Sequence, residues 1–425
     1  MRTSLFTRFA AAAGVLVLAA VLPAPLVAAD PAVVPTATMT TPRTDDCPHR
    51  SHTPPPVDES EVVAPGATAP PPLPVPAAPV GGGRLGECGL VVDPAAGAVP
   101  DRINSAGWLV ADLDTGRVIA AKDPHGRYRP ASTIKVLLAL VALDELDLQT
   151  PVAATPEDWS MEGDSCGMGP GGTYTVRDLL SGLLVVSGND CANALARQLG
   201  GVPAALAKMN AEAAALGAHD TRAATPSGLD AAGMSTSPFD LATIFRAAMA
   251  HPTFRQLIGM KTYLFPGYPP RADVPGDVDH PAWTMGTSNT LLRDDWPGML
   301  GGKTGFTDDA QKTFVGAAER DGRTVVVVQM FGLNEQDNSY AQQAERLFEY
   351  GFAAPPSASV GTLAVGSSSG SPDGGDHAAM QHDRATGRNA WGLQAVGRNA
   401  WSVGLLGFAA VCLAAAGAVR LRRRR

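Results

Sequence analysis

The chain has 425 residues, of which 45% are hydrophobic and 17% are charged, so it is long enough for one or two domains with a buried core. Its formal net charge of -8 leaves no basic stripe to neutralise phosphates, which argues against nucleic acid as a partner. This composition is ordinary for a globular protein, so the indications of function have to come from local features.

The N-terminus has the three parts of a secretory signal peptide. Arg2 and Arg8 supply positive charge, an apolar run follows at Phe9–Leu22, and small residues suited to cleavage precede Asp30. A retained signal-anchor is the alternative. We expect residues 1–29 to be removed and the rest of the chain to be exported.

Residues 30–102 are rich in Pro, Ala, Val and Gly, a composition that cannot build a core. It predicts an extended, partly polyproline extracytoplasmic arm. The short stretch Cys47–His52 contains residue types found in metal sites, but no further ligands cluster near it. We therefore expect a solvated linker with one disulfide and no bound metal.

Four of the cysteines fall in the region expected to be exported, where disulfides persist. These candidates are Cys47, Cys88, Cys166 and Cys191. Three pairings are possible from the sequence. We favour Cys47–Cys88, which would close a loop across the arm, and Cys166–Cys191, which would tie a loop to the segment after Asn189. Free thiols are the alternative.

Residues 103–354 have the pattern of a folded domain, with strands at both ends and helices between them. Strands are predicted at 107–113, 117–121, 302–307, 313–319 and 324–331, with a hairpin turn at Asp321-Gly322. Helices are predicted at 132–143, 175–186, 190–199, 203–216 and 339–352, and a further one from Ser237. This order predicts an α+β fold, in which an antiparallel sheet is flanked by helices and carries a mostly helical subdomain.

The C-terminal part of the chain reads as a membrane attachment. Residues 355–399 are Gly/Ser-rich and predict a flexible tether. Ala400–Val419 has no charged residue and is about as long as the roughly 20 residues that cross a hydrocarbon core. The arginines of residues 420–425 should stay in the cytoplasm, so we expect a single-pass membrane protein with an extracytoplasmic domain. A buried core helix is the alternative for this span.

The first candidate catalytic motif is Ser132-Thr133-Ile134-Lys135, at the start of a predicted helix. Positions i and i+3 share a helix face, so Lys135 can act as the base that a serine nucleophile requires. The helix N-terminus disfavours the ammonium form of the lysine and offers the Ser132 amide to a developing oxyanion. Because Ser and Lys are common residues, this motif alone is a weak signal.

The second candidate motif is Ser187-Gly188-Asn189, between two predicted helices. The hydroxyl of Ser187 can relay a proton between Lys135 and a leaving amine, and Asn189 can hold a substrate amide. Ser, Gly and Asn also suit a plain turn between helices, which is the alternative for this motif taken alone.

The third candidate motif is Lys303-Thr304-Gly305, on a predicted strand. Lys303 and Thr304 can bind a substrate carboxylate, and a glycine at the third position lets a substrate backbone come close. The amide of Phe306 can serve as a second oxyanion donor. An ordinary strand start is the alternative.

Together the motifs resemble the S-x-x-K, S-x-N and K-T-G set of the penicillin-binding and serine β-lactamase superfamily. Within it, residues 103–354 most resemble the D-alanyl-D-alanine carboxypeptidases of low molecular weight. Further matching segments are Arg129–Ser132, Ser187–Asp190 and Thr225–Leu229. The resemblance implies that the terminal D-Ala of peptidoglycan stem pentapeptides is removed through an acyl-serine. It also implies that β-lactams acylate the same serine and that no metal or cofactor takes part.

The resemblance also assigns roles to single residues. It makes Ser132 the nucleophile, Lys135 the base, Ser187 and Asn189 the second motif, and Lys303 with Thr304 the carboxylate site. The chain departs from larger family members, which have an extra β-rich domain and an amphipathic anchor after the catalytic domain. A Cys166–Cys191 disulfide beside the second motif would stiffen it.

Other functions on the same fold stay open. A class A β-lactamase uses a glutamate on a loop after the second motif, whereas the only Glu between Asn189 and Lys303 is Glu212, in an alanine-rich helical run. A non-catalytic envelope protein that binds peptidoglycan is a second alternative. An esterase or D-amino-acid amidase is a third.

Overall fold

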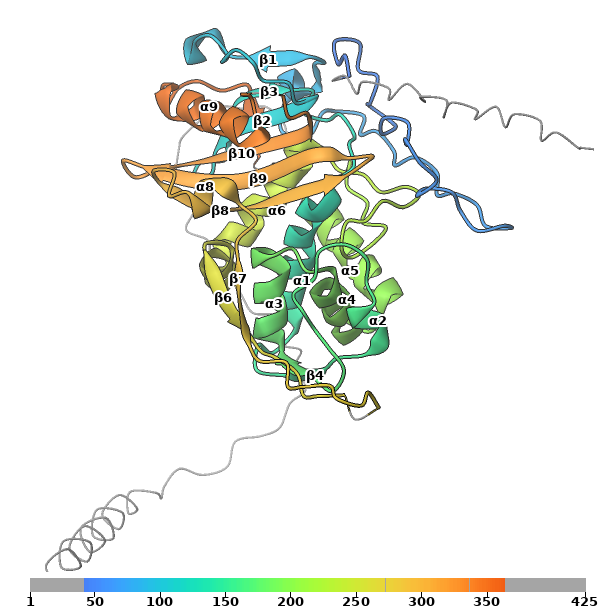
Figure 1. Cartoon of the computed structure of the whole chain (residues 1–425). Coiled ribbons are helices and arrows are strands. Elements are labelled where there is room, and N and C mark those ends of the chain that lie inside the picture. The colour runs from blue at the N-terminus through green and yellow to red at the C-terminus, as the bar shows by residue number, and fades with distance from the viewer. Residues whose placement is uncertain (1–41, 272, 336, 364–425) are drawn as a thin grey trace, which may run out of the picture. The chain divides into compact units, whose positions relative to one another are not determined.

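The computed structural model describes residues 42–271, 273–335 and 337–363 (Figure 1). The chain divides into Met1–Ser367 and Ser368–Arg425, and every described element belongs to the first unit. The predicted signal peptide, membrane span and basic tail lie outside the described residues, as does the tether from residue 364 onward. Among the described helices, none combines the length and the apolar character needed to span a bilayer.

The centre of this unit is one antiparallel sheet. Its path is β1-β3-β2-β10-β9-β8, and β11 pairs with β3. The strands are β1 (Leu90–Val92), β2 (Gly107–Asp112), β3 (Arg117–Lys122), β8 (Met299–Thr307), β9 (Gln311–Arg320), β10 (Arg323–Gly332) and β11 (Gly361–Thr362). The first and last parts of the domain therefore meet in the middle of the sheet, where Val110 lies opposite Val327.

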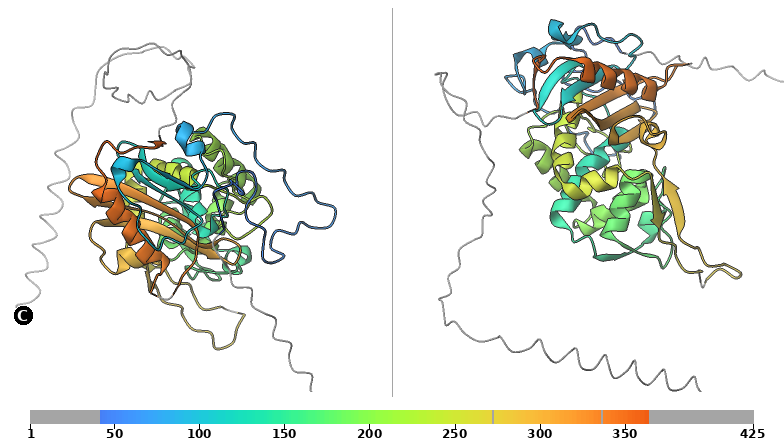
Figure 2. Two further views of the ribbon diagram at one scale, coloured as in Figure 1. Left: turned by 90° about the horizontal axis from the view of Figure 1, so that it is seen from above. Right: turned by 90° about the vertical axis from the view of Figure 1, so that its left-hand side faces the viewer.

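Helices cover both faces of the sheet (Figure 1; Figure 2, right). Alternate side chains of a strand point to opposite faces. Leu109 and Val326 pack with α1 (Lys135–Glu145) and α6 (Pro238–Ala250), whereas Val110 and Val327 pack with α9 (Tyr340–Ala353). The α1 side of the sheet also carries the helical subdomain.

The subdomain contains short helices and two small strand pairs. Its helices are α2 (Pro156–Trp159), α3 (Val176–Val185), α4 (Asn189–Gln198), α5 (Val202–Ala215) and α7 (Pro252–Ile258), and α8 (Thr290–Arg293) lies near β8. The pairs are β4 (Pro151–Ala153) with β5 (Thr173–Thr175) and β6 (Thr262–Phe265) with β7 (Trp283–Gly286). The predicted α+β fold, an antiparallel sheet with a mostly helical subdomain, is confirmed.

Local sequence signals explain where the main elements begin and turn. The Thr175 side chain accepts a bond from the Asp178 amide and Asp178 bonds back, so the capping box expected for α3 is present. The β9–β10 hairpin turns at Asp321 and Gly322, whose φ values of 52° and 73° are the left-handed pair that a two-residue hairpin loop requires.

The arm behaves differently from the solvated linker that its composition predicts. From residue 42 onward it packs on the domain, and β1 extends the sheet beside β3. Cys47 and Cys88 are bonded, with 5.1 Å between their Cα atoms, so the favoured pairing is present. The arm adds Leu85, Val91 and Ala96 to the hydrophobic core, and buried arginines of the domain also bind its backbone carbonyls. Composition does not report that kind of attachment.

Candidate active site

Ser132 lies on a turn of 3-10 helix, Ala131–Ile134, that leads directly into α1. The helix predicted from Ser132 therefore begins as a tighter turn, in which residues i and i+3 eclipse each other. This places Lys135 beside the serine, and its Nζ donates a hydrogen bond to Ser132 Oγ over 2.7 Å. The two ends of the first motif are in contact.

Lys135 is fully buried and has two further acceptors. Its Nζ lies 2.7 Å from Asn189 Oδ1 and 2.6 Å from the Ser227 carbonyl oxygen. Burial lowers the pKa of Lys135 well below its ordinary value, and the positive charge of Lys303 lowers it further. The neutral amine that a base must provide is therefore accessible at a lower pH than for an exposed lysine.

The second motif turns into α4 beside Lys135. Ser187 has a left-handed backbone, with φ of 69°, and its buried hydroxyl has no hydrogen-bond partner among the described residues. Asn189 Nδ2 donates to the Glu162 carbonyl over 2.6 Å, which turns the amide oxygen toward Lys135. The motif is a turn between helices, and it also faces the nucleophile.

The third motif runs along β8 against the nucleophile turn. A Cβ on Gly305 would lie 2.8 Å from the Ser132 backbone nitrogen and 2.4 Å from Thr313 Oγ1, so a larger residue cannot fit. Lys303 is buried, and its Nζ donates to the Thr304 carbonyl over 2.7 Å. Burial lowers the pKa of Lys303 to about 7. Phe306, 49% exposed, lies under Lys312 Nζ, which is 4.0 Å from the ring centroid.

The loop Thr225–Leu229, which the sequence indicated only through its resemblance to the family, also lies beside Ser132. The carbonyl of Ser227 accepts from Lys135, and Gly228 has φ of 90°. A Cβ on Gly228 would lie 2.0 Å from the Ala131 carbonyl oxygen, so the backbone of this loop touches the nucleophile turn. A backbone carbonyl has no residue-type signal, so the sequence could not assign this contact.

The sequence also missed the role of Asp190, which directly follows the second motif. Its buried carboxylate accepts from Ser165 Oγ over 2.6 Å and from the backbone amides of Cys166–Met168. These bonds hold the loop whose preceding residues, Gly163 and Asp164, line the pocket. Its place in the first turn of α4 was the available signal, since acidic residues are favoured there.

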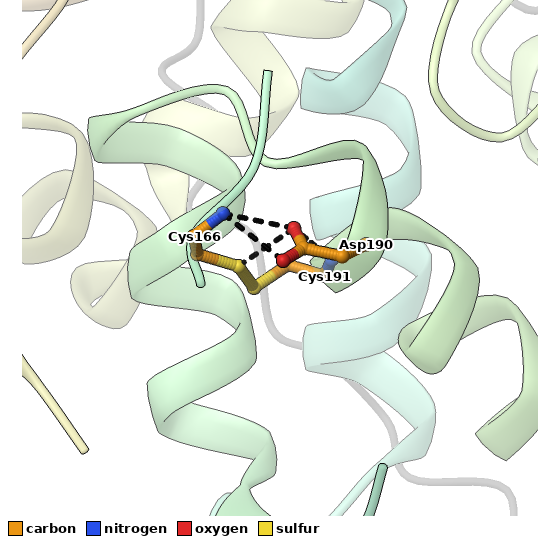
Figure 3. Close-up of side chains that lie close together, drawn as sticks. All are labelled: Cys166, Asp190 and Cys191. Carbon is orange, nitrogen blue, oxygen red and sulfur yellow. Dashed lines mark hydrogen bonds between the residues drawn. A yellow bond between two sulfur atoms is a disulfide. The ribbon is translucent and has the colours of Figure 1, made fainter. Parts of the chain in front are cut away.

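The Cys166–Cys191 disulfide joins the same two segments (Figure 3). The pair is the one favoured from the sequence, and the Cα atoms lie 6.5 Å apart. A Cβ on Gly188 would be 2.7 Å from Cys166 Sγ, so the disulfide packs directly against the second motif. The two sulfurs are bonded to each other, so they are not free to ligate a metal with Asp190.

Replacing both cysteines, Cys166→Ser with Cys191→Ser, is expected to lower the free energy of unfolding by about 3.5 kcal/mol, the value for a cross-link of this span. Denaturant titration of the double variant against the parent protein measures the change. The Cys47→Ser, Cys88→Ser variant provides the comparison away from the motif. An unchanged midpoint for the first double variant would show that Asp190 alone holds the loop.

Residues from all three motifs line one pocket of about 420 Å³. Its lining includes six of the predicted site residues: Ser132, Ser187, Asn189, Thr304, Gly305 and Phe306. Lys135 and Lys303 are fully buried behind it. Among the described residues that line the pocket, Asp164 is the only acid and there is no glutamate. Glu212, the only glutamate between Asn189 and Lys303, lies on α5 and is not among the residues that line the pocket.

This fold, with a serine and a buried lysine in contact beside a Lys-Thr-Gly strand, defines a serine enzyme of the penicillin-binding class. A family model described as D-alanyl-D-alanine carboxypeptidase matches residues 94–333. The chain belongs to the D-alanyl-D-alanine carboxypeptidase family, which confirms the family and the class of enzyme predicted from the motifs.

Individual relatives agree with the family match. The chain is 51% identical over 259 residues to D-alanyl-D-alanine carboxypeptidase DacB2 of Mycobacterium tuberculosis, a match that covers 60% of this chain and 85% of the relative. A crystal structure of a D-alanyl-D-alanine carboxypeptidase from the same organism is 47% identical, with a TM-score of 0.57, over 62% of this chain and 97% of that one. The Streptomyces K15 DD-transpeptidase is 28% identical, with a TM-score of 0.55, over 60% and 99%.

Proposed function

We propose that this protein removes the terminal D-alanine from peptidoglycan stem pentapeptides through an acyl-enzyme on Ser132. The observation that carries the proposal is the 2.7 Å contact between Lys135 Nζ and Ser132 Oγ, in a site where burial depresses the pKa of the lysine. A serine hydroxyl next to a neutral amine is an activated nucleophile. The family of the chain supplies the substrate class.

In the acylation step, neutral Lys135 takes the proton of Ser132 as its Oγ attacks the carbonyl carbon of the penultimate D-alanine. The amide of Ser132 donates to the oxyanion, and the amide of Phe306 is the proposed second donor. The C–N bond then breaks, and the leaving amine takes a proton. The unpartnered hydroxyl of Ser187, which lines the pocket, is the proposed relay for that proton.

In the second step, the oxygen of a water molecule attacks the acyl carbon, the ester C–O bond to Ser132 breaks to release the shortened peptide, and a proton from that water passes to Ser132 Oγ. A β-lactam would acylate the same hydroxyl by opening its ring, with no leaving group lost. The described pocket lining holds no glutamate to activate water, which supports slow hydrolysis of that adduct over the lactamase alternative.

Lys303 and Thr304 are proposed to bind the carboxylate of the terminal D-alanine. Thr304 lines the pocket, and its Oγ1 lies 3.0 Å from Ser288 Oγ, which also lines it. Lys303 lies buried behind them, and its ammonium form, favoured below its pKa of about 7, attracts a carboxylate more strongly in a dry site than it would in water. A free carboxylate at the end of the substrate is thus part of the proposed specificity.

The proposed setting is the outer face of the cell membrane. A cleaved signal peptide at residues 1–29 would export the domain, and the span Ala400–Val419 with its arginine tail would anchor it. Residues 355–399 would let the pocket reach the wall. Carbonate extraction of membranes and protease accessibility in spheroplasts test this arrangement, and recovery of the chain in the soluble fraction would contradict the anchor.

The activity is tested by mass spectrometry of a purified pentapeptide muropeptide after incubation with the protein. Loss of one terminal D-alanine is the expected result, and prior treatment with penicillin should block it. A cross-linked product would indicate a transpeptidase instead. An unchanged substrate would contradict the proposal and favour a peptidoglycan-binding protein without catalytic activity.

Lys303→Met is expected to move the acid limb of the pH profile of penicillin acylation to higher pH. The charge of Lys303 is one cause of the lowered pKa of Lys135, so removing it lets that pKa rise, and the base then stays protonated to a higher pH. Acylation rates with a fluorescent penicillin between pH 5 and pH 10 measure the shift.

Lys312→Met is the matched control, because Lys312 lines the same pocket but is not among the causes of the Lys135 shift. It should leave the acid limb where it is. An acid limb that moves equally in both variants, or in neither, would show that Lys303 does not tune the base.

A further inference from the structure

The loop closed by the Cys47–Cys88 disulfide, residues 48–87, is bonded to the irregular segment, residues 127–130, that leads into the nucleophile turn. The family match begins at residue 94, so this loop lies ahead of the matched region. Most of its bonds to the domain come from Arg127 and Arg129, which are buried and shortly precede Ser132. The loop is therefore attached to a part of the chain on which catalysis depends.

Arg127 gathers the two limbs of the loop. Its guanidinium donates to the carbonyls of Ser51, Leu73 and Pro74, over 3.1, 2.6 and 3.0 Å. Its Nε donates to Asp220 over 3.0 Å. Since Arg127 is 1% exposed, these acceptors take the place of the water that would otherwise satisfy its guanidinium.

Arg129 makes the charged contact nearer the nucleophile. Its Nη1 donates to the Pro54 carbonyl over 2.7 Å, and its Nε donates to the Glu61 carboxylate. The arginine side chain is 0% exposed and that of Glu61 is 18% exposed, so this ion pair is largely shielded from water. Asp309, 3.9 Å from Nε, is the second anion beside the guanidinium.

Asp309 links the same loop to the end of β8. Its carboxylate accepts from the Val57 amide over 2.5 Å and from Ser60 Oγ over 3.0 Å. Asp309 belongs to the β8–β9 turn, and Thr307, at the end of β8, lines the active-site pocket. One short stretch of the loop therefore holds both the lead-in to the nucleophile and the edge of the strand that carries the Lys-Thr-Gly motif.

Residues 129–131, which lead into Ser132, are tightly bonded to their surroundings, so a displacement of Arg129 would be passed on to Ser132. The carbonyl of Pro130 accepts from the hydroxyls of Thr133 and Thr313, over 2.6 and 2.8 Å. Ala131 has φ of 47°, a left-handed conformation that persists in a residue with a side chain only where its surroundings enforce it. A shift of Arg129 would reach Ser132 through these two residues.

We propose that the 48–87 loop is required for efficient acylation. Glu61 in the loop, with Arg129 and Asp309 in the domain, are positioning residues that align Ser132 with β8. This inference rests on the proposed function, because acylation is the step it concerns. None of the three residues lines the pocket, so they act on the reaction only through the segments they hold.

The test is the time course of labelling by a fluorescent penicillin in Glu61→Ala and in the matched control Glu59→Ala. Glu59 is exposed and two residues away, and only its backbone is bonded. Glu61→Ala is expected to lower the acylation rate constant about tenfold with an unchanged final amplitude, since small misplacements of reacting groups are costly. Glu61→Gln keeps an acceptor for Arg129 and should recover part of the rate.

The amplitude separates positioning from stability. An effect on folding alone would reduce the number of sites labelled and leave the rate constant of the remaining sites at the parent value, which would overturn the proposal. A parent rate and amplitude in Glu61→Ala would overturn it equally. If the parent protein itself formed no adduct, the proposed function would fail and the inference with it.

Opening the loop gives an independent check. The Cys47→Ser, Cys88→Ser variant is expected to slow acylation in the same direction as Glu61→Ala. Combining it with Glu61→Ala should slow the reaction by less than the product of the separate effects, because the changes act through one contact. Multiplicative effects would show that disulfide and ion pair act separately and would contradict a shared positioning role.

Discussion

Ser132→Ala is expected to abolish the covalent penicillin adduct and to reduce carboxypeptidase turnover by at least about 10⁴-fold, the scale on which loss of a serine nucleophile acts. The variant removes the only atom that the proposal allows to carry the acyl group. Its folding should change little, because within the described part of the chain the hydroxyl makes one hydrogen bond, with Lys135. Intact-protein mass spectrometry with penicillin measures the adduct, and muropeptide analysis measures turnover.

Ser181→Ala is the matched control for this variant. Ser181 is also buried, but its hydroxyl donates to the Arg177 carbonyl within α3, and it is not in the pocket lining. It should be labelled at the parent rate. An adduct that persists in Ser132→Ala would assign the nucleophile elsewhere, and Ser187 would then be the first candidate, because its hydroxyl lines the pocket and has no hydrogen-bond partner among the described residues.

The fold was predictable where the sequence pattern repeats. The strands β2, β3, β9 and β10 fall within a residue or two of their expected ranges, because each is an apolar run ended by a turn signal. The β4–β5 and β6–β7 pairs were missed. They have three or four residues per strand, too few to show alternation, and their pairing depends on the helices beside them.

The candidate site was predictable as far as residue type carries chemistry. The side chains of Ser132 and Lys135 meet within hydrogen-bond distance, as the first motif predicted, whereas the bond from Lys135 to Asn189 was not predicted, because Asn189 was expected only to hold a substrate amide. Contacts made by backbone atoms were not predictable. The Ser227 carbonyl that bonds Lys135 and the close approach of Gly228 to Ala131 depend on where a distant loop lies, which no local pattern states.

The packing of residues 42–102, the described part of the arm, on the domain was also not predictable from residue types. Proline-rich composition predicts a chain that cannot form a core of its own, and the arm instead adds Leu85 and Val91 to the core of the domain. Besides this packing and the pairing of β1 with β3, the arm is held by buried arginines of the domain, such as Arg127, which donate to its carbonyls. A buried arginine has five N–H donors that need acceptors. The acceptors of Arg127 in the arm are backbone carbonyls, which no residue type marks in the sequence.

Lys135→Met is expected to slow penicillin acylation by about 10³- to 10⁴-fold, the upper part of the range for loss of general base catalysis. Methionine approximates the length of lysine in a fully buried position and cannot accept a proton. The change leaves Asn189 Oδ1 and the Ser227 carbonyl without their donor, which costs stability. It also removes a buried amine that was costly to desolvate, so the net change in stability should be modest.

Lys135→Arg separates the role of a base from that of a charge. Arginine keeps a positive charge at this position but cannot give up its proton in a protein. If Lys135 acts as the base, the arginine variant should be as slow as the methionine variant, provided that thermal unfolding shows both to be folded. Retention of the parent rate within about tenfold in Lys135→Arg would mean that the charge alone suffices. The lowered pKa of Lys135 argues against that result, because a site that disfavours the ammonium form suits a residue that acts as an amine.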